Sequence, residues 1–314
     1  MKTYANRLLA TLLIIVLIFT SAPFVYGAET KTLTADFTSS IGKTRASADI
    51  MTVTADTFDG CYGNQLSKMA REIYDTFEED FEISYNPSEI IVKFEEKYLF
   101  DSIEELSAEI GIAGQAALDA FHFDHPEIFW FYLCSSSYNI GSFGDKYTVF
   151  TMRINVEELY EGASSKGGIF ESAVNSAYEE IKSSVSDLEN RREVLRKIHD
   201  YVCENATYAT TFTNTVYSPA SFFIGDKSLV CEGYSKTFKI LCDKFGIPCT
   251  LVSGTADTNT QTDAPHMWIY VQMDDGRWYL VDTTWDDQDS RIYDTYFLAN
   301  YNSDGFYKKI SEER

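Results

Sequence analysis

The chain has 314 residues, of which 45% are hydrophobic and 15% aromatic, and its formal net charge is −22. This apolar and aromatic content excludes an intrinsically disordered chain, and the length suits about two domains. The large excess of carboxylates disfavours binding to nucleic acids and to anionic membrane surfaces.

The N-terminus has the pattern of an export signal. Lys2 and Arg7 precede an apolar run from Leu8 to Phe19, and a short segment with small residues ends at Gly27. The run is too short for a comfortable membrane span, so we expect a signal peptide over residues 1–27, with an uncleaved anchor as the alternative. Cleavage gives a secreted or cell-surface protein with no stable membrane insertion, in a compartment that permits disulfides.

Two segments follow before the most informative part of the chain. Residues 28–60 are rich in Thr, Ser, Ala and Asp without clear periodicity, which predicts a linker or tail. Residues 61–160 mix helical and β-type patterns and predict an α+β N-terminal region. Within it, Ser102 and Glu105 form a capping box that starts a helix.

Residues 161–314 predict a second domain with a helix-rich first half. Ser186 and Glu189 are expected to cap the second of two helices. A longer helix begins at Cys231 and carries an apolar stripe that ends where Gly246 and Pro248 prevent continuation. Three β-type runs come next, and TYFLA near the C-terminus predicts a further strand.

The turn between the last two β-type runs decides what lies near Cys231. If residues 274–276 form a three-residue hairpin loop, Trp268 faces Asp282, and His266 and Asp282 become diagonal neighbours on one face. A loop of only residues 275–276 moves Asp282 to the opposite face. A Cys–His–Asp site therefore requires the three-residue loop.

Such a site has the parts of a thiol nucleophile. A helix N-terminus favours the thiolate of Cys231, and its free N–H groups can hold an oxyanion. His266 can exchange a proton with the thiol while Asp282 fixes the imidazole tautomer. Trp268 and Trp285 lie near this triad in the expected register, either lining a substrate cleft or packing the core.

The sequence VCEGYSKTFKILCDKFGIPC, followed by HMWIYV and RWYLVDTTWDD, closely resembles the core motifs of the bacterial transglutaminase-like superfamily. IHDYVCENATY and LDAFHFDHPEIFWF are similar to upstream segments of its exported members. The resemblance covers roughly residues 115–300 and is densest at 228–287. It implies a papain-like core, in which the Cys-bearing helix packs on an antiparallel sheet, and a catalytic triad of Cys231, His266 and Asp282.

The superfamily implies acyl transfer through a thioester and includes transglutaminases, peptidases, amidases and members without catalysis. We therefore expect an exported thiol enzyme that acts on a peptide or protein substrate, with the cell envelope as one source of substrate. Tyr217 is the candidate for the additional oxyanion donor of the animal transglutaminases. The alternative is a catalytically silent peptide- or glycan-binding module that retains the triad.

The remaining reactive residues favour structural roles. Six cysteines in 314 residues are too few for a disulfide scaffold, and Cys203, Cys242 and Cys249 are expected as buried thiols or one disulfide. His199 is expected to pack in the interior, while Asp286 and Asp287 are expected at a solvated strand end. No cofactor and no metal site are expected.

Overall fold

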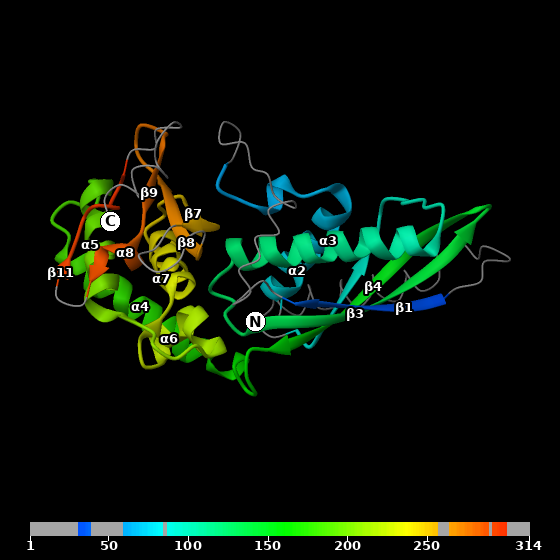
Figure 1. The fold of residues 1–314 in the computed structure, drawn as a ribbon, viewed down its shortest axis with the longest axis horizontal. Coiled ribbons are helices and arrows are strands. Elements are labelled where there is room, and N and C mark those ends of the chain that lie inside the picture. Colours follow the sequence, from blue (N-terminus) through cyan, green and yellow to red (C-terminus); the bar gives the residue numbers. More distant parts are fainter. Residues whose placement is uncertain (1–30, 39–58, 84–86, 257–263, 289–290, 300–314) are drawn as a thin grey trace, which may run out of the picture.

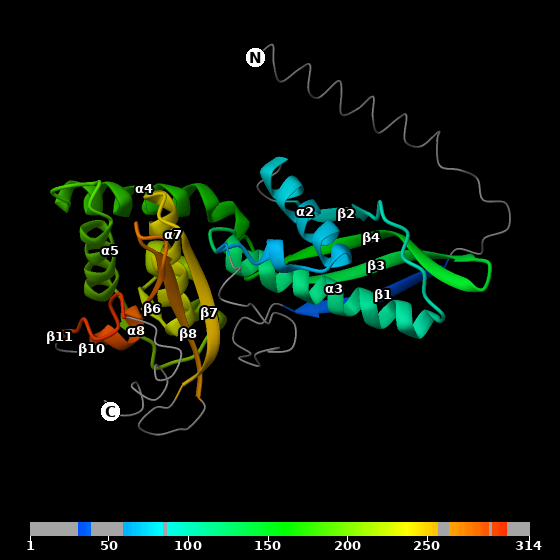
Figure 2. The ribbon, with the colours of Figure 1, turned by 90° about the horizontal axis from the view of Figure 1, so that it is seen from above.

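The structure is a computed structural model that describes residues 31–38, 59–83, 87–256, 264–288 and 291–299, with the backbone alone for 31–38, 83 and 132–133. The expected signal peptide at 1–27 and the end of the chain from residue 300 lie outside the described residues. Helices and strands alternate in two units that lie side by side (Figures 1 and 2). This mixture of helices and antiparallel sheets confirms the α+β class.

The first unit is built on a four-stranded antiparallel sheet in the order β1-β3-β4-β2, against which two helices pack. Its elements are β1 (Lys31–Thr38), η1 (Gly63–Gln65), α2 (Lys68–Ile83), β2 (Glu89–Lys93), α3 (Ile103–Asp124), β3 (Phe131–Phe143) and β4 (Lys146–Glu158). In β3 every second residue from Cys134 to Ile140 is buried, as expected for a sheet with one covered face. Ser102 caps α3 by accepting a hydrogen bond from the Glu105 N–H, as the capping box predicts.

Strand β1 corrects part of the expected linker. Residues 31–38 pair with β3 along its whole length, from Lys31 opposite Ile140 to Thr38 opposite Leu133. The segment contains three threonines, which favour strands, and an edge strand needs only one partner. The pairing joins residues far apart in sequence, so local composition alone does not reveal it.

The second unit surrounds α7. Its helices are η2 (Ser164–Lys166), α4 (Gly167–Ser184), α5 (Arg191–Asn205), η3 (Asn214–Tyr217), α6 (Pro219–Ile224), α7 (Cys231–Lys244) and α8 (Thr283–Asp286). Its strands are β5 (Thr207–Tyr208), β6 (Ser228–Leu229), β7 (Cys249–Ala256), β8 (Ala264–Gln272), β9 (Trp278–Val281), β10 (Asp287–Gln288) and β11 (Arg291–Ile292). Helix α7 contacts β7 and β8 on one side and α4, α5 and α6 on the other, so residues from Glu232 to Cys242 are all buried. No described helix combines the length and the hydropathy that a membrane span requires.

The end of α7 follows the expected stop. Gly246 has φ +66°, which suits glycine at the position after the cap. The Ile247 N–H donates to the Cys242 carbonyl at 3.0 Å, and the Gly246 N–H donates to the Asp243 carbonyl at 3.0 Å. These two bonds are the Schellman motif, and they turn the chain directly into β7.

The hairpin between β8 and β9 has the three-residue loop that a triad requires. Gly276 has φ +76°, and its N–H donates to the Met273 carbonyl at 2.9 Å. Ile269 lies opposite Val281 and Gln272 opposite Trp278, which extends to Trp268 opposite Asp282. The predicted register is confirmed.

Two other expectations about local structure are wrong. Asn190, not Ser186, caps α5, by accepting from the Glu193 N–H at 3.2 Å. Ser186 instead donates to the carboxylate of that same Glu193. The TYFLA segment forms turns and one isolated bridge, between Leu280 and Ala299, instead of a strand.

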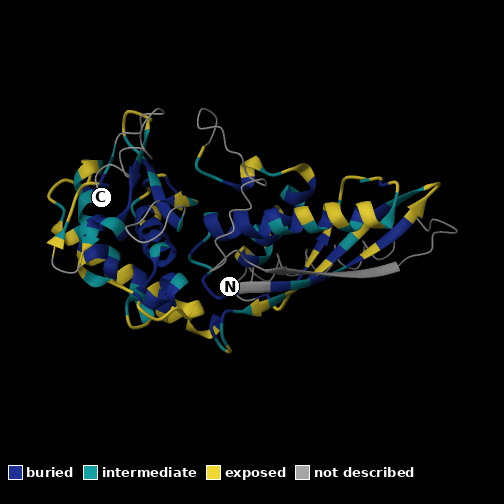
Figure 3. Cartoon of the chain, in the orientation of Figure 1, coloured by how far each residue is buried: buried dark blue, intermediate teal, exposed yellow. Residues whose placement is uncertain are grey.

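The C-terminal half of α3 lies at the junction of the two units. All residues from Ala116 to Phe123 are buried, whereas the first half of the helix keeps an exposed side (Figure 3). Continuous burial around a helix indicates packing partners on every side. The boundary predicted near residue 160 stays a prediction, and it falls between β4 and η2.

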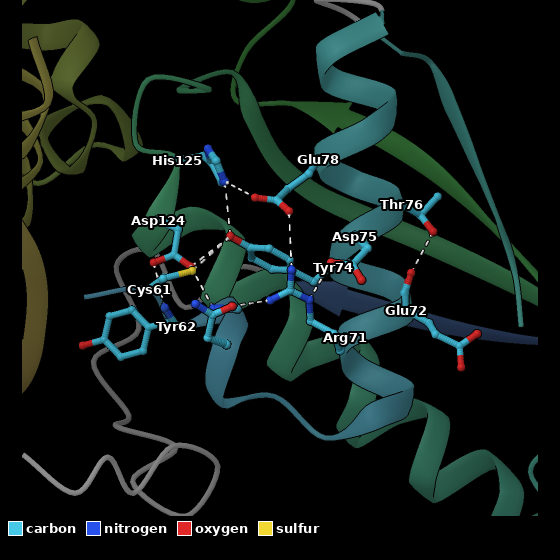
Figure 4. Close-up of polar contacts among 12 residues, drawn as sticks. Cys61, Tyr62, Arg71, Glu72, Tyr74, Asp75, Thr76, Glu78, Asp124 and His125 are labelled. Carbon is cyan, nitrogen blue, oxygen red and sulfur yellow. Dashed lines mark hydrogen bonds and ion pairs between the residues drawn. The ribbon is translucent and has the colours of Figure 1, made fainter. Parts of the chain in front are cut away.

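Asp124, the last residue of α3, binds the segment 61–63, which enters this junction (Figure 4). Its carboxylate accepts from the N–H groups of Tyr62 and Gly63 at 2.9 Å each, from the Tyr74 hydroxyl at 3.0 Å and from the Cys61 thiol at 3.4 Å. Tyr62 then reaches across the junction, where its hydroxyl donates to the Leu251 carbonyl of β7 at 2.5 Å. Asp124 therefore holds the residue that attaches the first unit to the second.

Replacing Asp124 by Ala should lower the free energy of unfolding by about 1–3 kcal/mol, because several donors lose their acceptor together. Urea denaturation measures the loss. Asp101→Asn is the matched control, since that carboxylate pairs with Lys146 at the surface and should contribute less than about 1 kcal/mol. Equal losses in the two variants would contradict the role given to Asp124.

Candidate active site

Cys231 is the first residue of α7 and is half-buried. The preceding residue, Val230, is extended (φ −103°, ψ 178°) and supplies no side-chain cap. The first turn of an uncapped helix offers N–H groups and a positive dipole end to an anion. The thiol and the helix N-terminus therefore face the same place, where a negative charge is stabilised.

His266 and Asp282 lie on the same sheet face beside this thiol. His266 Nε2 is 2.6 Å from Asp282 Oδ2, and both side chains are buried. The Cys231 thiol lies close enough to the imidazole to raise the pKa of His266. Since Nε2 is engaged by the carboxylate, Nδ1 is the nitrogen left for the thiol.

The surroundings of His266 favour its protonated form. Burial alone lowers the pKa of an imidazole, but the Asp282 carboxylate and the nearby Cys231 outweigh it and raise the pKa of His266 to about 10. An imidazolium beside a thiol stabilises the thiolate. The geometry and the charges together suit a thiolate–imidazolium pair.

Trp268 and Trp285 both stack on His266, and they differ in exposure. The Trp285 ring is parallel to the imidazole within 11° at a centroid distance of 4.4 Å, while the Trp268 ring lies at 6.0 Å and 27°. Trp268 is buried against Leu280 and Tyr296 in a small apolar cluster. Trp285 is half-buried, so of the two it is the one that can also meet a ligand.

Two tyrosines border the thiol from the chain upstream of α7. Burial raises the pKa of Tyr217, and the charges of Glu232 and Cys231 raise it further. Burial likewise raises the pKa of Tyr208, followed by the charge of Cys231, although this ring is 49% exposed. Tyr217 therefore lies in the expected neighbourhood, and Tyr208 is a neighbour that the sequence did not single out.

Gly233 allows the segment that carries Tyr217 to approach α7. A Cβ atom at position 233 would lie 2.6 Å from the Val216 carbonyl oxygen and 2.6 Å from a methyl carbon of Leu229. The Val216 carbonyl also accepts from the Val230 N–H at 3.0 Å, so the two backbones cannot separate freely. The glycine in CEGY is thus explained by close packing next to Cys231.

A second histidine–aspartate pair lies near the first and corrects an expectation. Asp286 is completely buried, with Oδ2 at 3.1 Å from His199 Nε2, rather than at a solvated strand end. Asp287 is half-buried and accepts from the Tyr234 hydroxyl at 2.6 Å. His199 is buried as expected. The sequence did not reveal its carboxylate partner, although the two adjacent acidic residues after Trp285 were a signal for one.

The cysteines and the remaining histidines do not assemble into a metal site in the described part of the chain. All six cysteines, each in the described part of the chain, are free thiols, and Cys242 and Cys249 are buried neighbours. The described residues contain no group of three or more His, Cys, Asp or Glu side chains arranged for a metal ion. His122 donates from Nε2 to the Phe131 carbonyl at 2.8 Å, and burial followed by the charge of Lys236 lowers its pKa to about 3.

Replacing Gly233 by Ala should lower the free energy of unfolding by about 1–3 kcal/mol, because the new methyl group overlaps backbone and core atoms. Thermal unfolding followed by circular dichroism measures the change. Gly168→Ala in α4 is the control, since nothing lies within 4 Å of its Cβ position and the variant should be as stable or slightly more so. A stable Gly233→Ala protein would contradict the close approach.

The two buried imidazolium groups predict a dependence of stability on pH. Burial lowers the pKa of His199, but Asp200 and Asp286 raise it to about 11, while an unperturbed histidine titrates at 6.5. Because the folded state binds this proton more tightly, its stabilisation is complete below pH 6.5 and is lost as the pH rises toward 11. His266 acts in the same direction up to about pH 10.

The free energy of unfolding in urea should therefore fall between pH 7 and pH 9.5. The slope should be smaller in His199→Gln and unchanged in His122→Gln, because His122 is neutral throughout this range. If the free energy of unfolding falls with the same slope in wild type, His199→Gln and His122→Gln, His199 is not protonated in the folded protein.

Comparison with known proteins gives one family match, which spans the candidate site. Residues 179–283, which include Cys231, His266 and Asp282, match the model of the transglutaminase-like superfamily. No curated protein matches the sequence significantly.

Solved structures give distant similarities. A TGase structure has 14% identity and a TM-score of 0.33 over 52% of this chain, which spans only 46% of the length of that TGase. The periplasmic domain of TgpA from Pseudomonas aeruginosa has 12% identity and a TM-score of 0.28, covering 49% of this chain and 69% of that one. A candidate cysteine protease from Cytophaga hutchinsonii has 15% identity and a TM-score of 0.30, covering 63% and 64%. The family match over residues 179–283 agrees with the motifs: this segment is similar to the core of the transglutaminase-like superfamily.

Proposed function

We propose that this protein is an exported thiol enzyme that acts on an amide or peptide carbonyl through an acyl-enzyme on Cys231. The observation that carries the proposal is the His266 imidazole bound at Nε2 by Asp282 at 2.6 Å, with the Cys231 thiol beside the ring. This arrangement supports a nucleophile beside its base, with a group that orients the base. Export rests on the N-terminal sequence pattern.

In the first half-reaction the Cys231 thiolate attacks the carbonyl carbon and forms a tetrahedral intermediate. N–H groups at the start of α7 stabilise the oxyanion, and Tyr217 is the candidate for an additional donor. The His266 imidazolium gives its Nδ1 proton to the leaving amine nitrogen as the C–N bond breaks. The product is a thioester on Cys231 and a neutral His266, still held by Asp282.

In the second half-reaction neutral His266 takes a proton from the attacking group while that group adds to the thioester carbonyl. Collapse of the intermediate breaks the C–S bond and restores the thiolate–imidazolium pair. Water gives hydrolysis, which we put first, and an amine gives acyl transfer. The acidic composition favours an uncharged or basic peptide over an anionic polymer as substrate.

A binding module of the cell envelope is the second candidate, because families of this kind include members that keep the residues without turnover. The exposed ring of Tyr208 next to Cys231 would suit such a role, since aromatic faces bind peptides and sugars. The two candidates differ in turnover, and only the enzyme requires a reactive Cys231.

Alkylation by iodoacetamide tests the thiolate–imidazolium pair without a known substrate. We expect the alkylation rate constant of Cys231 at pH 6 to be within about threefold of its value at pH 9, because the thiolate is already present. His266→Ala should lower the rate at pH 6 at least about tenfold and leave the rate at pH 9 similar. Mass spectrometry of the labelled peptide separates Cys231 from the five other thiols. A Cys231 that reacts like a model thiol at both pH values would overturn the enzyme.

Turnover then distinguishes hydrolysis from transfer. A peptide library is incubated with the protein with and without a primary amine acceptor, beside Cys231→Ala. Released amine alone supports hydrolysis, and incorporated acceptor supports transfer. A reactive Cys231 without either product would favour the binding module.

A further inference from the structure

A fully buried charged pair next to the proposed triad has no part in the mechanism above. His199 in α5 and Asp286 at the end of α8 are both 0% exposed, and His199 Nε2 is 3.1 Å from Asp286 Oδ2. His199 Nδ1 is also 3.0 Å from Asp200 Oδ1. Each ring nitrogen faces a carboxylate oxygen, an arrangement that suits a doubly protonated ring donating to both carboxylates. Burial of such a pair costs desolvation and is weak evidence for stability alone, which directs attention to what the pair holds in place.

The His199–Asp286 pair holds α8, the helix that directly follows the proposed catalytic aspartate. Asp282 precedes α8 and caps it, because its Oδ1 accepts from the N–H groups of Thr284 and Trp285 at 3.1 Å each. Asp286 ends the same helix. This single turn is therefore fixed by a carboxylate at each end, one bound to His266 and the other to His199.

Asp286 also holds the aromatic neighbour of the helix. Both of its carboxylate oxygens accept from the Tyr296 N–H, at 3.1 and 3.2 Å. The Tyr296 ring packs edge-on against Trp285 at a centroid distance of 5.1 Å. Trp285 in turn stacks on His266 at 4.4 Å, so a continuous series of contacts leads from Asp286 to the imidazole.

We propose that His199 and Asp286 are a positioning pair, which fixes α8 so that Asp282 and Trp285 hold His266 in the orientation that serves Cys231. The proposal rests on the thiol chemistry proposed above. The pair acts through Asp282 and Trp285 and has no direct part in bond breaking. The other groups that face His199 are Asp200, which also pairs with Arg196 at 3.6 Å, and the Cys203 thiol at 4.0 Å from Nε2.

The two carboxylates around His199 offer a matched test, because only one of them belongs to α8. Asp286→Asn and Asp200→Asn each remove one charge next to the same imidazole. Cys231 alkylation by iodoacetamide is measured from pH 6 to pH 9.5 in both variants and in wild type. We expect Asp286→Asn to lower the rate at pH 6 at least about tenfold with less than about twofold change at pH 9.5, and Asp200→Asn to keep the wild-type profile. Loss of access to the thiol would instead reduce the rate at every pH. An unfolded variant would react like a model thiol, so circular dichroism first establishes that each variant is folded.

A second variant and a second measurement cover the case in which Asp286→Asn does not fold. His199→Gln leaves the Asp286–Tyr296 bonds in place and should show the same loss at low pH. Selective ¹⁵N labelling of the four histidines reports the His266 ring directly by NMR, and its titration midpoint should fall in Asp286→Asn and in His199→Gln.

The outcomes separate this proposal from the proposed function. Folded Asp286→Asn and His199→Gln proteins with wild-type alkylation and His266 titration would overturn the positioning pair and leave the thiol enzyme intact. Equal effects of Asp200→Asn and Asp286→Asn would also overturn it, since the effect would then follow the charge of His199 and not the position of α8. A wild-type Cys231 that shows no reactivity at pH 6 would overturn the proposed function itself.

Discussion

The carboxylate of Asp282 performs two tasks with its two oxygens, and the arrangement of the site depends on both. Oδ2 binds His266 at 2.6 Å, and Oδ1 caps α8 through two backbone N–H groups. Asp282 thus connects the end of β9 at Val281 to the start of α8 at Thr283. A carboxylate fixed by backbone donors has little freedom to rotate, so the imidazole that it holds has a defined orientation.

The two histidine–aspartate pairs have similar chemistry, but their surroundings differ in exposure, and this suits them to different roles. His266 and His199 both have a carboxylate within 3.1 Å, and burial opposes the protonation of both. His266 has a half-buried thiol as its other neighbour, and His199 has a second carboxylate and no exposed surface. The first pair can exchange its proton with a bound molecule, and the second can only hold its surroundings in place.

Local signals predicted the parts of the site that depend on short stretches of sequence. Gly246 ended α7, and the Asp274–Asp275–Gly276 loop set the register that brings Asp282 beside His266. Contacts between distant segments were not predictable in this way. Residues 31–38 pair with β3, which begins about a hundred residues later in the chain. The burial of Asp286 depends on its pairing with His199 in α5. A polar run such as TTWDD carries no local mark that separates a buried anion from a solvated one.

The hydrogen bond from Tyr62 to Leu251 has a consequence for how the second unit can exist by itself. In the described part of the chain β7 is an outer strand of its sheet, with β8 on one side only. Outer strands with free carbonyl groups can recruit strands from other molecules and promote aggregation. The Tyr62 hydroxyl occupies one of these carbonyls, and α3 contacts the same strand. The first unit therefore covers part of an edge that β7 would otherwise leave open to other strands, which gives it a role independent of any chemistry at Cys231.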